Sequence, residues 1–285
     1  MSTIIIGLSL GMLLLLLAAG LTIIFGMLGV INFAHGAIYM LGAYVSYEIT
    51  KRTGSFILGV GVAAISTALI GALIERITLR PLYDRPHYYQ LLLTFGLILI
   101  VSEVVRFIWG AGYQEVSIPS LLNGTFEVAG STIPIYRLFV IGFGGLVSVA
   151  LYLMLEKSTF GVMIRAASSD AEMVQVLGLP VALIRMAVFA IGCGLSGLAG
   201  AIAAPLYPVE LGMATNTIID CFIVVILGGL GNIRGAVAAS LLIGMVRAIG
   251  YVYLPGWVEV MTFLLLIGTL LTRPHGLFHR TTRVA

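Results

Sequence analysis

Five polar side chains interrupt two otherwise aliphatic stretches of this sequence, and their types and spacing could handle a polar solute. Asn32, His35 and Tyr39 lie at i, i+3 and i+7, and Asn216 and Asp220 lie at i and i+4. On a helix each set would share one face. Polar groups in hydrocarbon are costly unless they are paired, so each face is expected to turn toward the protein interior or a water-filled path.

The sequence leaves more than one interpretation of these residues open. Asn32 and His35 either line a solute path or tie neighbouring helices together by hydrogen bonds. Asp220 has no basic residue near it on its own segment, so it either pairs across helices with Arg247 or Arg234 or faces the path. The sequence contains no HExxH motif and no His, Cys and carboxylate cluster at ligand spacing. It therefore predicts no catalytic centre and no metal site.

The composition determines which elements must hold these residues. Hydrophobic residues make up 60% of the chain and charged residues 9%, and the mean hydropathy is +1.13. Apolar runs of about 18 or more residues recur along the chain, each long enough to cross a hydrocarbon core of roughly 30 Å as a helix. The sequence predicts an all-α, polytopic integral membrane protein with about eight to nine transmembrane helices in a single domain, residues 1–285. Membrane lipid is its expected surrounding, and no nucleic-acid partner is expected.

Basic residues orient the predicted segments, because short loops rich in Lys and Arg stay in the cytoplasm. The predicted segments are 3–25, 28–49, 55–74, 89–109, 136–155, 183–206, 216–231, 234–252 and 257–272. Nine crossings would place one group of basic residues on a single side, namely Arg76, Arg80, Arg85, Lys157, Arg165, Arg185, Arg234, Arg273, Arg280 and Arg283. The N-terminus is therefore expected outside and the C-terminus inside, with Lys51 and Arg52 as the clearest exception. If segment 216–231 were a re-entrant hairpin, the basic tail would instead lie outside.

The predicted inner loop, residues 156–182, carries its own helix signals. Ser168 or Ser169 can cap a short amphipathic helix that begins at Asp170, and Gly178 can end it. The sequence thus predicts a helix of one to two turns on the cytoplasmic face. It is either an ordinary interfacial helix or an element that docks into a groove on a cytoplasmic partner.

Four blocks of the sequence together carry a family resemblance. The blocks are GVINFAHGAIYMLGAYVS (29–46), IERITLRPLY (74–83), RAASSDAEMVQVLG (165–178) and LGGLGNIRGAVAASLLIG (227–244). In order and approximate spacing they resemble the LivH-type permease subunit of branched-chain amino acid ABC transporters. The third block resembles the coupling loop of bacterial ABC importer permeases.

The resemblance implies a permease subunit that moves branched-chain or related amino acids, or a similar small polar solute, across the bacterial inner membrane by alternating access. It implies a second homologous permease subunit, two cytoplasmic ATP-binding subunits and a periplasmic or extracellular solute-binding protein as partners. The loop residues Arg165, Asp170, Glu172 and Gly178 would couple the chain to the ATP-binding subunits. The chain has no GxxxxGK[ST] loop, so ATP is expected to be bound and hydrolysed by the partners, with no cofactor on this chain.

Two positions depart from the family pattern, and a function of another class stays open. Ala37 follows the FAHG stretch where the family usually has an acidic residue, and Asp220 stands where it usually has a lysine. Both changes alter charge near the candidate path, so other amino acids, amides, urea or small carboxylates are also candidate solutes. The alternative is a stand-alone, ion-coupled secondary transporter or channel that uses Glu103, His35 or Asp220 to couple ions. The predicted docking helix favours the importer.

Overall fold

The computed structural model of the protein describes residues 2–128, 131–273 and 276–277. Within these residues, seven helical segments are long and apolar enough to cross a membrane. They are α1 (Ser2–Leu28), Phe56–Leu82 with α3 (Phe56–Ile74), α4 (His87–Trp109), α5 (Ile135–Lys157), α8 (Val181–Ala203), α10 (Ile233–Tyr253) and Pro255–Thr272 with α11 (Val258–Thr272). The prediction of an all-α, polytopic membrane protein is confirmed. The predicted tail residues Arg280 and Arg283 lie outside the described residues.

Two of the nine predicted segments differ from the structure. Segment 28–49 is not one helix, because α1 ends at Leu28, residues 29–34 are non-helical, and α2 covers His35–Thr53. Segment 216–231 corresponds to α9 (Met213–Gly228), which is only 16 residues long. A helix of that length rises about 24 Å, less than the roughly 30 Å of a hydrocarbon core. By length and composition, seven helices qualify as spans among the described residues, against the eight to nine predicted. Residues 29–53 and 210–232 nevertheless also carry the chain from one end of the bundle to the other, since Gly26 adjoins Gly231 at one end and residues 51–56 lie beside residues 115–121 at the other.

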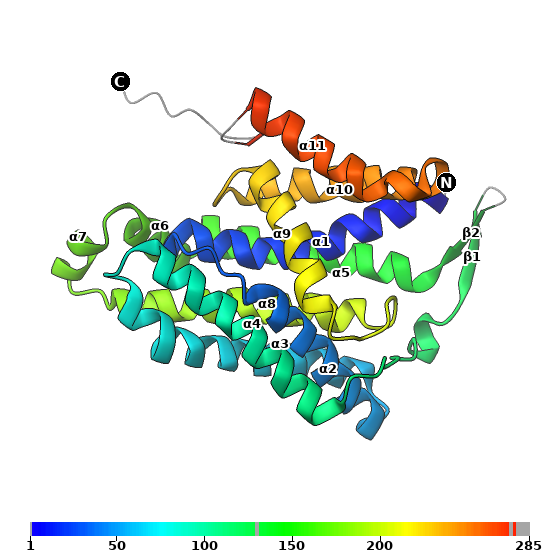
Figure 1. Cartoon of the computed structure of the whole chain (residues 1–285), viewed down its shortest axis with the longest axis horizontal. Helices are drawn as coiled ribbons and strands as arrows, with labels where there is room; N and C mark the ends of the chain where they lie inside the picture. The colour runs from blue at the N-terminus through cyan, green and yellow to red at the C-terminus, as the bar shows by residue number, and fades with distance from the viewer. Residues whose placement is uncertain (1, 129–130, 274–275, 278–285) are drawn as a thin grey trace.

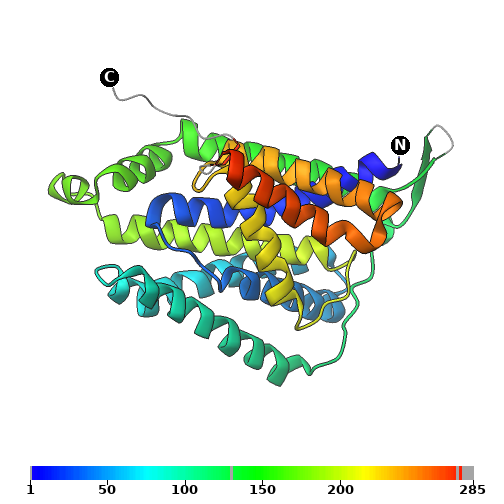
Figure 2. The ribbon, with the colours of Figure 1, turned by 45° about the horizontal axis from the view of Figure 1, so that its top comes forward.

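The bundle is built around α1, which packs mainly against α8 and α10, while α2 packs against α3, α8 and α9. In Figures 1 and 2, α1, α8 and α10 run side by side, whereas α9 crosses their direction. The N-terminus and a β-hairpin lie at one end of the bundle, and two short helices, α6 (Thr159–Ser169) and α7 (Ala171–Val176), lie at the other (Figure 1). These ends are called the hairpin end and the loop end below.

A short β-hairpin and a backbone bridge organise the connections at the hairpin end. Strand β1 (Thr125–Val128) pairs antiparallel with β2 (Ser131–Pro134), a feature absent from the all-α prediction. Gln114, ahead of the hairpin, exchanges two backbone hydrogen bonds of 2.9 and 2.8 Å with Val209, in the loop after α8. This bridge ties the loop over residues 204–212 to the α4–α5 connection.

Glycines allow α2 to sit in the centre of the bundle. A Cβ atom on Gly36 would lie 2.1 Å from the carbonyl oxygen of Ala214 in α9, and one on Gly42 would lie 2.3 Å from that of Gly197 in α8. From the α8 side, a Cβ on Gly200 would lie 2.0 Å from the carbonyl oxygen of Tyr39. No side chain fits at such distances, so the backbones of α2, α8 and α9 touch directly.

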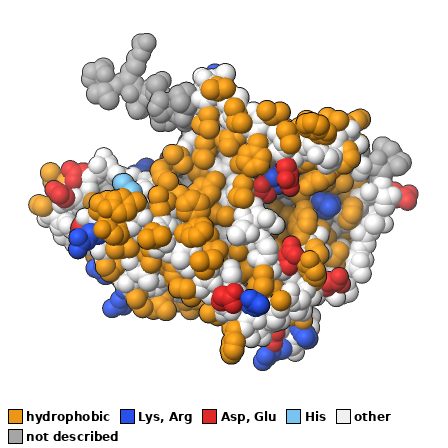
Figure 3. All heavy atoms as spheres, viewed as in Figure 1, with side chains coloured by type: hydrophobic (Ala, Val, Ile, Leu, Met, Phe, Trp, Pro, Cys, Tyr) orange, Lys and Arg blue, Asp and Glu red, His pale blue; other side chains and the backbone are white. Residues whose placement is uncertain are grey.

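The outer surface is that of a protein surrounded by lipid. Many large hydrophobic side chains of α3, α4 and α5 are more than half exposed, among them Leu69, Leu92 and Leu146. Figure 3 shows one face covered mostly by hydrophobic side chains, with charged groups concentrated toward the edges and only a few within it. The few charged groups inside the hydrophobic region are the ones that require an explanation.

Candidate functional site: a cavity at the hairpin end and a loop at the opposite end

A cavity of about 480 Å³ lies in the hairpin half of the bundle, between α1, α2, α5, α9, α10 and the loop after α8. Three of the five predicted path residues, Tyr39, Asn216 and Asp220, line it. They come from α2 and α9, the two helices that the predicted spans described least well. The structure therefore brings together residues from both polar sets, and this hairpin-end cavity is the candidate solute site.

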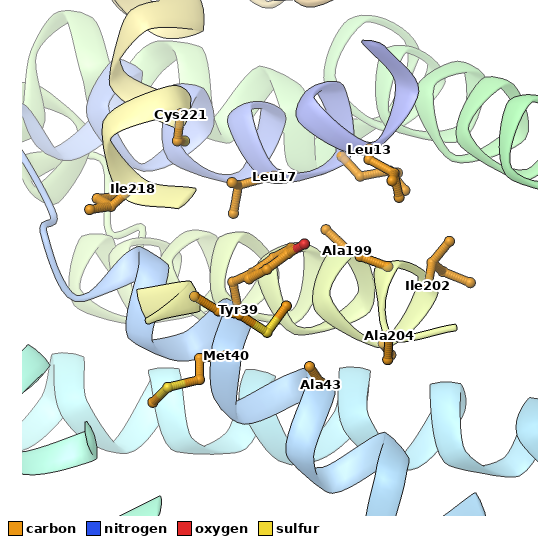
Figure 4. Close-up of a cluster of buried hydrophobic side chains, with 14 of the residues drawn as sticks. Leu13, Leu17, Tyr39, Met40, Ala43, Ala199, Ile202, Ala204, Ile218 and Cys221 are labelled. Carbon is orange, nitrogen blue, oxygen red and sulfur yellow. The ribbon is translucent and has the colours of Figure 1, made fainter. Parts of the chain in front are cut away.

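Tyr39 reaches the cavity from the centre of the bundle. Its side chain is 6% exposed and lies between α1 and α8. Figure 4 shows Tyr39 extending from α2 into the space between Leu17 of α1 and Ala199 of α8. Leu17 and Tyr39 both line the cavity. The phenol is thus a polar group presented from an otherwise apolar part of the wall.

Asn32 and His35 do not line the cavity, and the predicted common helix face is wrong for Asn32. This residue lies in the non-helical segment before α2, because Gly29 takes a φ of +64° that ends α1 and interrupts the helix. His35 is the first residue of α2 and is fully buried. Its Nε2 lies 3.0 Å from the carbonyl oxygen of Leu17, and its own carbonyl accepts a 2.8 Å hydrogen bond from Ser196.

These contacts place His35 directly behind the cavity wall, as a tie between helices. Through Leu17, which lines the cavity, it fixes α1 against the start of α2, and through Ser196 it fixes α8. Asn32 differs, since its side chain is 1% exposed and neither amide atom has a hydrogen-bond partner among the described residues. An unsatisfied buried amide costs roughly 1–3 kcal/mol, so the position of Asn32 requires an explanation beyond these contacts.

Asp220 is held by Arg247, which was one of the alternatives left open by the sequence. Arg247 Nη1 donates to Asp220 Oδ2 at 2.6 Å, and a second short hydrogen bond joins Nη2 to Oδ1. The two side chains are 23% and 17% exposed and belong to α9 and α10. The bidentate pair neutralises both charges at the cavity wall. The other candidate partner, Arg234, instead lies 3.4 Å from Glu156 at the loop end.

Two further charged residues of the cavity escaped the sequence reasoning. Arg137 lies in the first turn of α5, and its Nη1 donates to Ser9 Oγ at 2.9 Å. Glu210 lies in the loop after α8, close to the Gln114–Val209 bridge. In the sequence, Arg137 is only a single basic residue at the start of an apolar segment, and Glu210 is only a single acidic residue shortly after the Tyr-Pro pair at 207–208. Neither identifies a site without the fold that brings them to one cavity.

At the loop end, the predicted short helix is confirmed as α7, and a second helix, α6, precedes it. Asp170 caps α7, since its Oδ1 accepts a 2.9 Å hydrogen bond from the backbone N–H of Met173. Ser168 and Ser169 are therefore not the cap but belong to the end of α6. Gly178 takes a φ of +81°, and its N–H donates to the carbonyl of Gln175, which ends the turn after α7 as predicted.

The α6–α7 unit projects from the bundle and carries an uncovered apolar tip. Met173, Val176 and Leu177 are 56%, 82% and 71% exposed. Figure 1 shows α7 at the far end of the projection, away from the spans. Val174, on the opposite side of α7, is buried against the base of the unit. The helix is thus anchored on one face and presents hydrophobic side chains on another.

The other two predicted coupling residues, both exposed, lie on different helices of the projection. Glu172 is exposed in the first turn of α7, where its charge suits the positive end of the helix. Arg165, on α6, donates to the carbonyl of Leu155 at the end of α5. Ser168 donates to the carbonyl of Gly26 in α1 at 2.8 Å. The projecting unit is therefore hydrogen-bonded to two of the membrane-spanning helices.

A separate contact joins the start of α8, which follows the projection, to the end of the Phe56–Leu82 segment. Arg185, in the first turns of α8, places its guanidinium 4.8 Å from the ring centre of Tyr83. The hydroxyl of Tyr83 donates to Glu75 at 2.9 Å. Burial and the neighbouring Glu75 carboxyl raise the pKa of Tyr83, which keeps the phenol a proton donor. The start of α8 is thus tied to the end of the Phe56–Leu82 segment.

No group of three or more His, Cys, Asp or Glu side chains that could hold a metal ion is found in the part of the chain that the structure describes. The arrangement instead consists of a partly charged cavity in one half of a membrane bundle and a projection at its opposite end that is hydrogen-bonded to α1 and α5. Such a molecule can hold a small polar solute between spans and can respond to a partner that contacts the projection.

Comparisons with known proteins give full-length relatives. The chain is 29% identical to the "High-affinity branched-chain amino acid transport system permease protein LivH" of Escherichia coli (strain K12), covering 96% of this chain and 94% of the relative. It is 30% identical to the permease protein BraD of Pseudomonas aeruginosa, which has the same high-affinity branched-chain amino acid description, with the same coverage. It is also 28% identical to the "Probable branched-chain amino acid transport permease protein LivH" of Methanocaldococcus jannaschii, over 93% of this chain and 88% of the relative. No solved structure gives a significant match.

The match to a family model agrees with these relatives. Residues 3–270 match the model described as the permease component of the branched-chain amino acid transport system. A permease component moves a solute and has no catalytic centre of its own, and it works with partner subunits. The chain is a multi-pass membrane protein that belongs to the family of branched-chain amino acid ABC transport permeases.

Proposed function

We propose that this chain is the membrane-spanning permease of an ABC importer that takes up branched-chain or related amino acids, or a similar small polar solute, by alternating access across a bacterial cytoplasmic (inner) membrane. The whole chain, residues 1–285, acts as one transmembrane permease domain. The observation that carries the proposal is the α6–α7 projection with its exposed apolar tip, since a stand-alone transporter needs no such element.

The projection supports coupling to ATP-binding subunits on the cytoplasmic side. Its tip side chains Met173, Val176 and Leu177 suit an apolar groove on a partner. Arg165, Asp170 and Gly178 hold its conformation through the contacts and caps described above, and Glu172 presents an exposed charge to the partner. Closure of the ATP-binding subunits would then push α7, and α8 and α3 would tilt with it.

The hairpin-end cavity supports a solute path in which Tyr39, Asn216 and Asp220 face the solute and Asn32 and His35 stand behind or beside it. The Asn32 amide, buried and unsatisfied in this state, would find its partners in another state of the transport cycle. The partners are a second homologous permease subunit, two cytoplasmic ATP-binding subunits and a periplasmic or extracellular solute-binding protein. The chain itself binds no cofactor, and ATP is bound and hydrolysed by the partners.

The proposal places the loop end in the cytoplasm, with the N-terminus outside. A single cysteine at Asn123, near the hairpin, is expected to react with an impermeant thiol reagent in intact cells, whereas one at Val176 or Arg273 is expected to be shielded. The buried native residues Cys193 and Cys221 are first replaced by alanine. Labelling at Val176 from outside, with Asn123 shielded, would reverse the orientation.

One reconstitution separates the importer from the stand-alone alternative. The purified chain alone and the full complex with its binding protein are placed in separate proteoliposomes and supplied with radiolabelled leucine. The importer predicts uptake only by the complex and only with ATP. Uptake by the chain alone under a sodium or proton gradient would support the ion-coupled transporter instead. Glu103 is a weak candidate for that coupling, because it lies exposed beside Arg106 at 3.4 Å.

A further inference from the structure

The hairpin-end cavity has two unlike walls, and this difference bears on what it can hold. On one wall, five aliphatic side chains of α1 follow one helix face, at positions 6, 10, 13, 14 and 17. Four charged side chains from other elements also line the cavity, namely Arg137, Glu210, Asp220 and Arg247. A volume of about 480 Å³ suits a small solute. The occupant should therefore have an apolar side and a charged side.

The four charges are not equivalent. Asp220 and Arg247 form a bidentate ion pair, so their charges neutralise each other. Arg137 donates to the neutral hydroxyl of Ser9, and no ion pair within 4.0 Å joins Arg137 or Glu210 to another side chain in the described part of the chain. Both side chains are only partly exposed. The cavity thus presents one uncompensated cation and one uncompensated anion.

An uncompensated charge near the membrane interior is costly, so a bound solute that neutralises it gains the difference. A guanidinium matches the planar geometry of a carboxylate, and a carboxylate accepts hydrogen bonds from an ammonium group. An α-amino acid carries both groups on one carbon atom and is neutral overall. A solute with only one of them would leave the other protein charge without a partner.

We propose that Arg137 and Glu210 are specificity-determining residues of this cavity, with Arg137 taking the carboxylate and Glu210 the ammonium group of a zwitterionic solute. The α1 wall covers the solute's apolar side chain, and the Asp220–Arg247 pair bounds the cavity without binding the solute's charges. This inference rests on the proposed function, because it takes the cavity to be part of the solute path.

The test measures direct binding to the permease, since a solute-binding protein would mask the permease's own selectivity. The complex of the chain with its partner permease and ATP-binding subunits is purified without the binding protein, and radiolabelled leucine is the probe. Competition uses two analogues, isopentylamine, which lacks the carboxylate, and 4-methylpentanoate, which lacks the amine. The variants are Arg137→Gln and Glu210→Gln, with Arg106→Gln on α4 as the matched control outside the cavity.

Both cavity variants are expected to bind leucine at least about tenfold more weakly, which corresponds to the loss of one charge-assisted contact of ~1.4 kcal/mol. Arg137→Gln should leave competition by isopentylamine unchanged, and Glu210→Gln should leave competition by 4-methylpentanoate unchanged. Arg106→Gln should bind like the unaltered protein. Thermal unfolding and subunit co-purification establish that each variant is folded.

Two outcomes would overturn the inference. Unchanged leucine binding in both variants would show that the charges do not contact the solute. Equal losses for leucine and for both analogues would show that they shape the cavity or pair with each other in another state. Neither outcome touches the proposed function, which fails only if the unaltered complex shows no ATP-driven uptake.

Discussion

Helix α7 and the start of α2 both follow a break in a helical path, but they are held in place in different ways. Helix α7 is fixed by its own neighbours in sequence, with the Asp170 cap before it and the left-handed Gly178 after it. The start of α2 is fixed by distant elements, through Leu17 of α1, Ser196 of α8 and the close contact of Gly36 with Ala214. The exposed helix α7 is encoded locally, and the buried start of α2 is encoded by packing.

The largest expected effect comes from adding a side chain at the start of α2. Gly36→Val would place a Cβ atom 2.1 Å from the Ala214 carbonyl oxygen, so α9 or α2 must move. Overpacking of this kind costs about 1–3 kcal/mol or more. We expect most of the variant to be lost from the folded fraction in detergent, as measured by fluorescence size-exclusion chromatography.

The matched control is Gly61→Val in α3, where a Cβ atom meets nothing within 4 Å. It makes the same chemical change in another membrane helix and should leave the folded fraction near that of the unaltered protein. Equal recovery of the Gly36 and Gly61 variants would contradict the claim that packing determines the position of α2.

Substitutions of polar residues in and just before α2 are expected to have an intermediate effect, on the rate of transport. Asn32→Ala removes an amide that has no hydrogen-bond partner in this state, so it should not lower stability. If the amide or the Tyr39 phenol acts in the transport cycle, Asn32→Ala and Tyr39→Ala should lower leucine uptake by about tenfold, or ~1.4 kcal/mol in the rate-limiting step.

The comparison variant for this experiment is Leu41→Ala, which truncates another buried side chain of α2. Uptake is measured at equal expression of the assembled complex. If the Asn32 and Tyr39 variants transport as well as the unaltered protein, these residues serve helix packing alone, and the solute path must be assigned to other residues.

The smallest effect is expected at α7. Asp170→Ala removes the cap that accepts the Met173 N–H, at a cost of about 1 kcal/mol. Because α7 is exposed and locally encoded, the loss should stay local. Hydrogen exchange should speed up by about fivefold at the amides of residues 171–176 while the melting temperature of the complex stays the same.

Gln175→Ala, at an exposed position within α7 that provides no cap, should leave exchange unchanged. A loss of global stability in Asp170→Ala would mean that α7 is held by the bundle after all, which would remove the contrast with α2.

The same contrast explains which features the sequence could predict. Hydropathy predicts the seven long spans, and local capping residues predict α7. The predicted bounds of these elements agree with the structure to within a few residues. The break at residues 29–34 was missed, because an apolar segment with helical spacing gives no sign of an interruption unless the positive φ of Gly29 is known. Helix α6 was missed because its helix signals were read as part of a loop.

The cavity was predictable only in part, for a related reason. Tyr39, Asn216 and Asp220 could be selected as polar residues within hydrophobic segments, and the Asp220–Arg247 pair was one of the stated alternatives. Arg137 and Glu210 lie near the ends of segments, where charged residues are common. The Gln114–Val209 bridge, which joins the loop after α8 to a distant segment, helps to bring Glu210 to the cavity, and no local sequence pattern predicts this bridge.

The central claim is that the α6–α7 projection passes a partner's movement into the spans, and substrate-stimulated ATP hydrolysis by the reconstituted complex tests it most directly. Asp170→Lys opposes the helix dipole, and Gly178→Val strains a residue at φ +81° by about 1–2 kcal/mol. Both variants should insert normally but lose the stimulation that loaded binding protein produces, through weakened docking or uncoupling. Normal co-purification of the ATP-binding subunits with undiminished stimulation in both variants would contradict the claim.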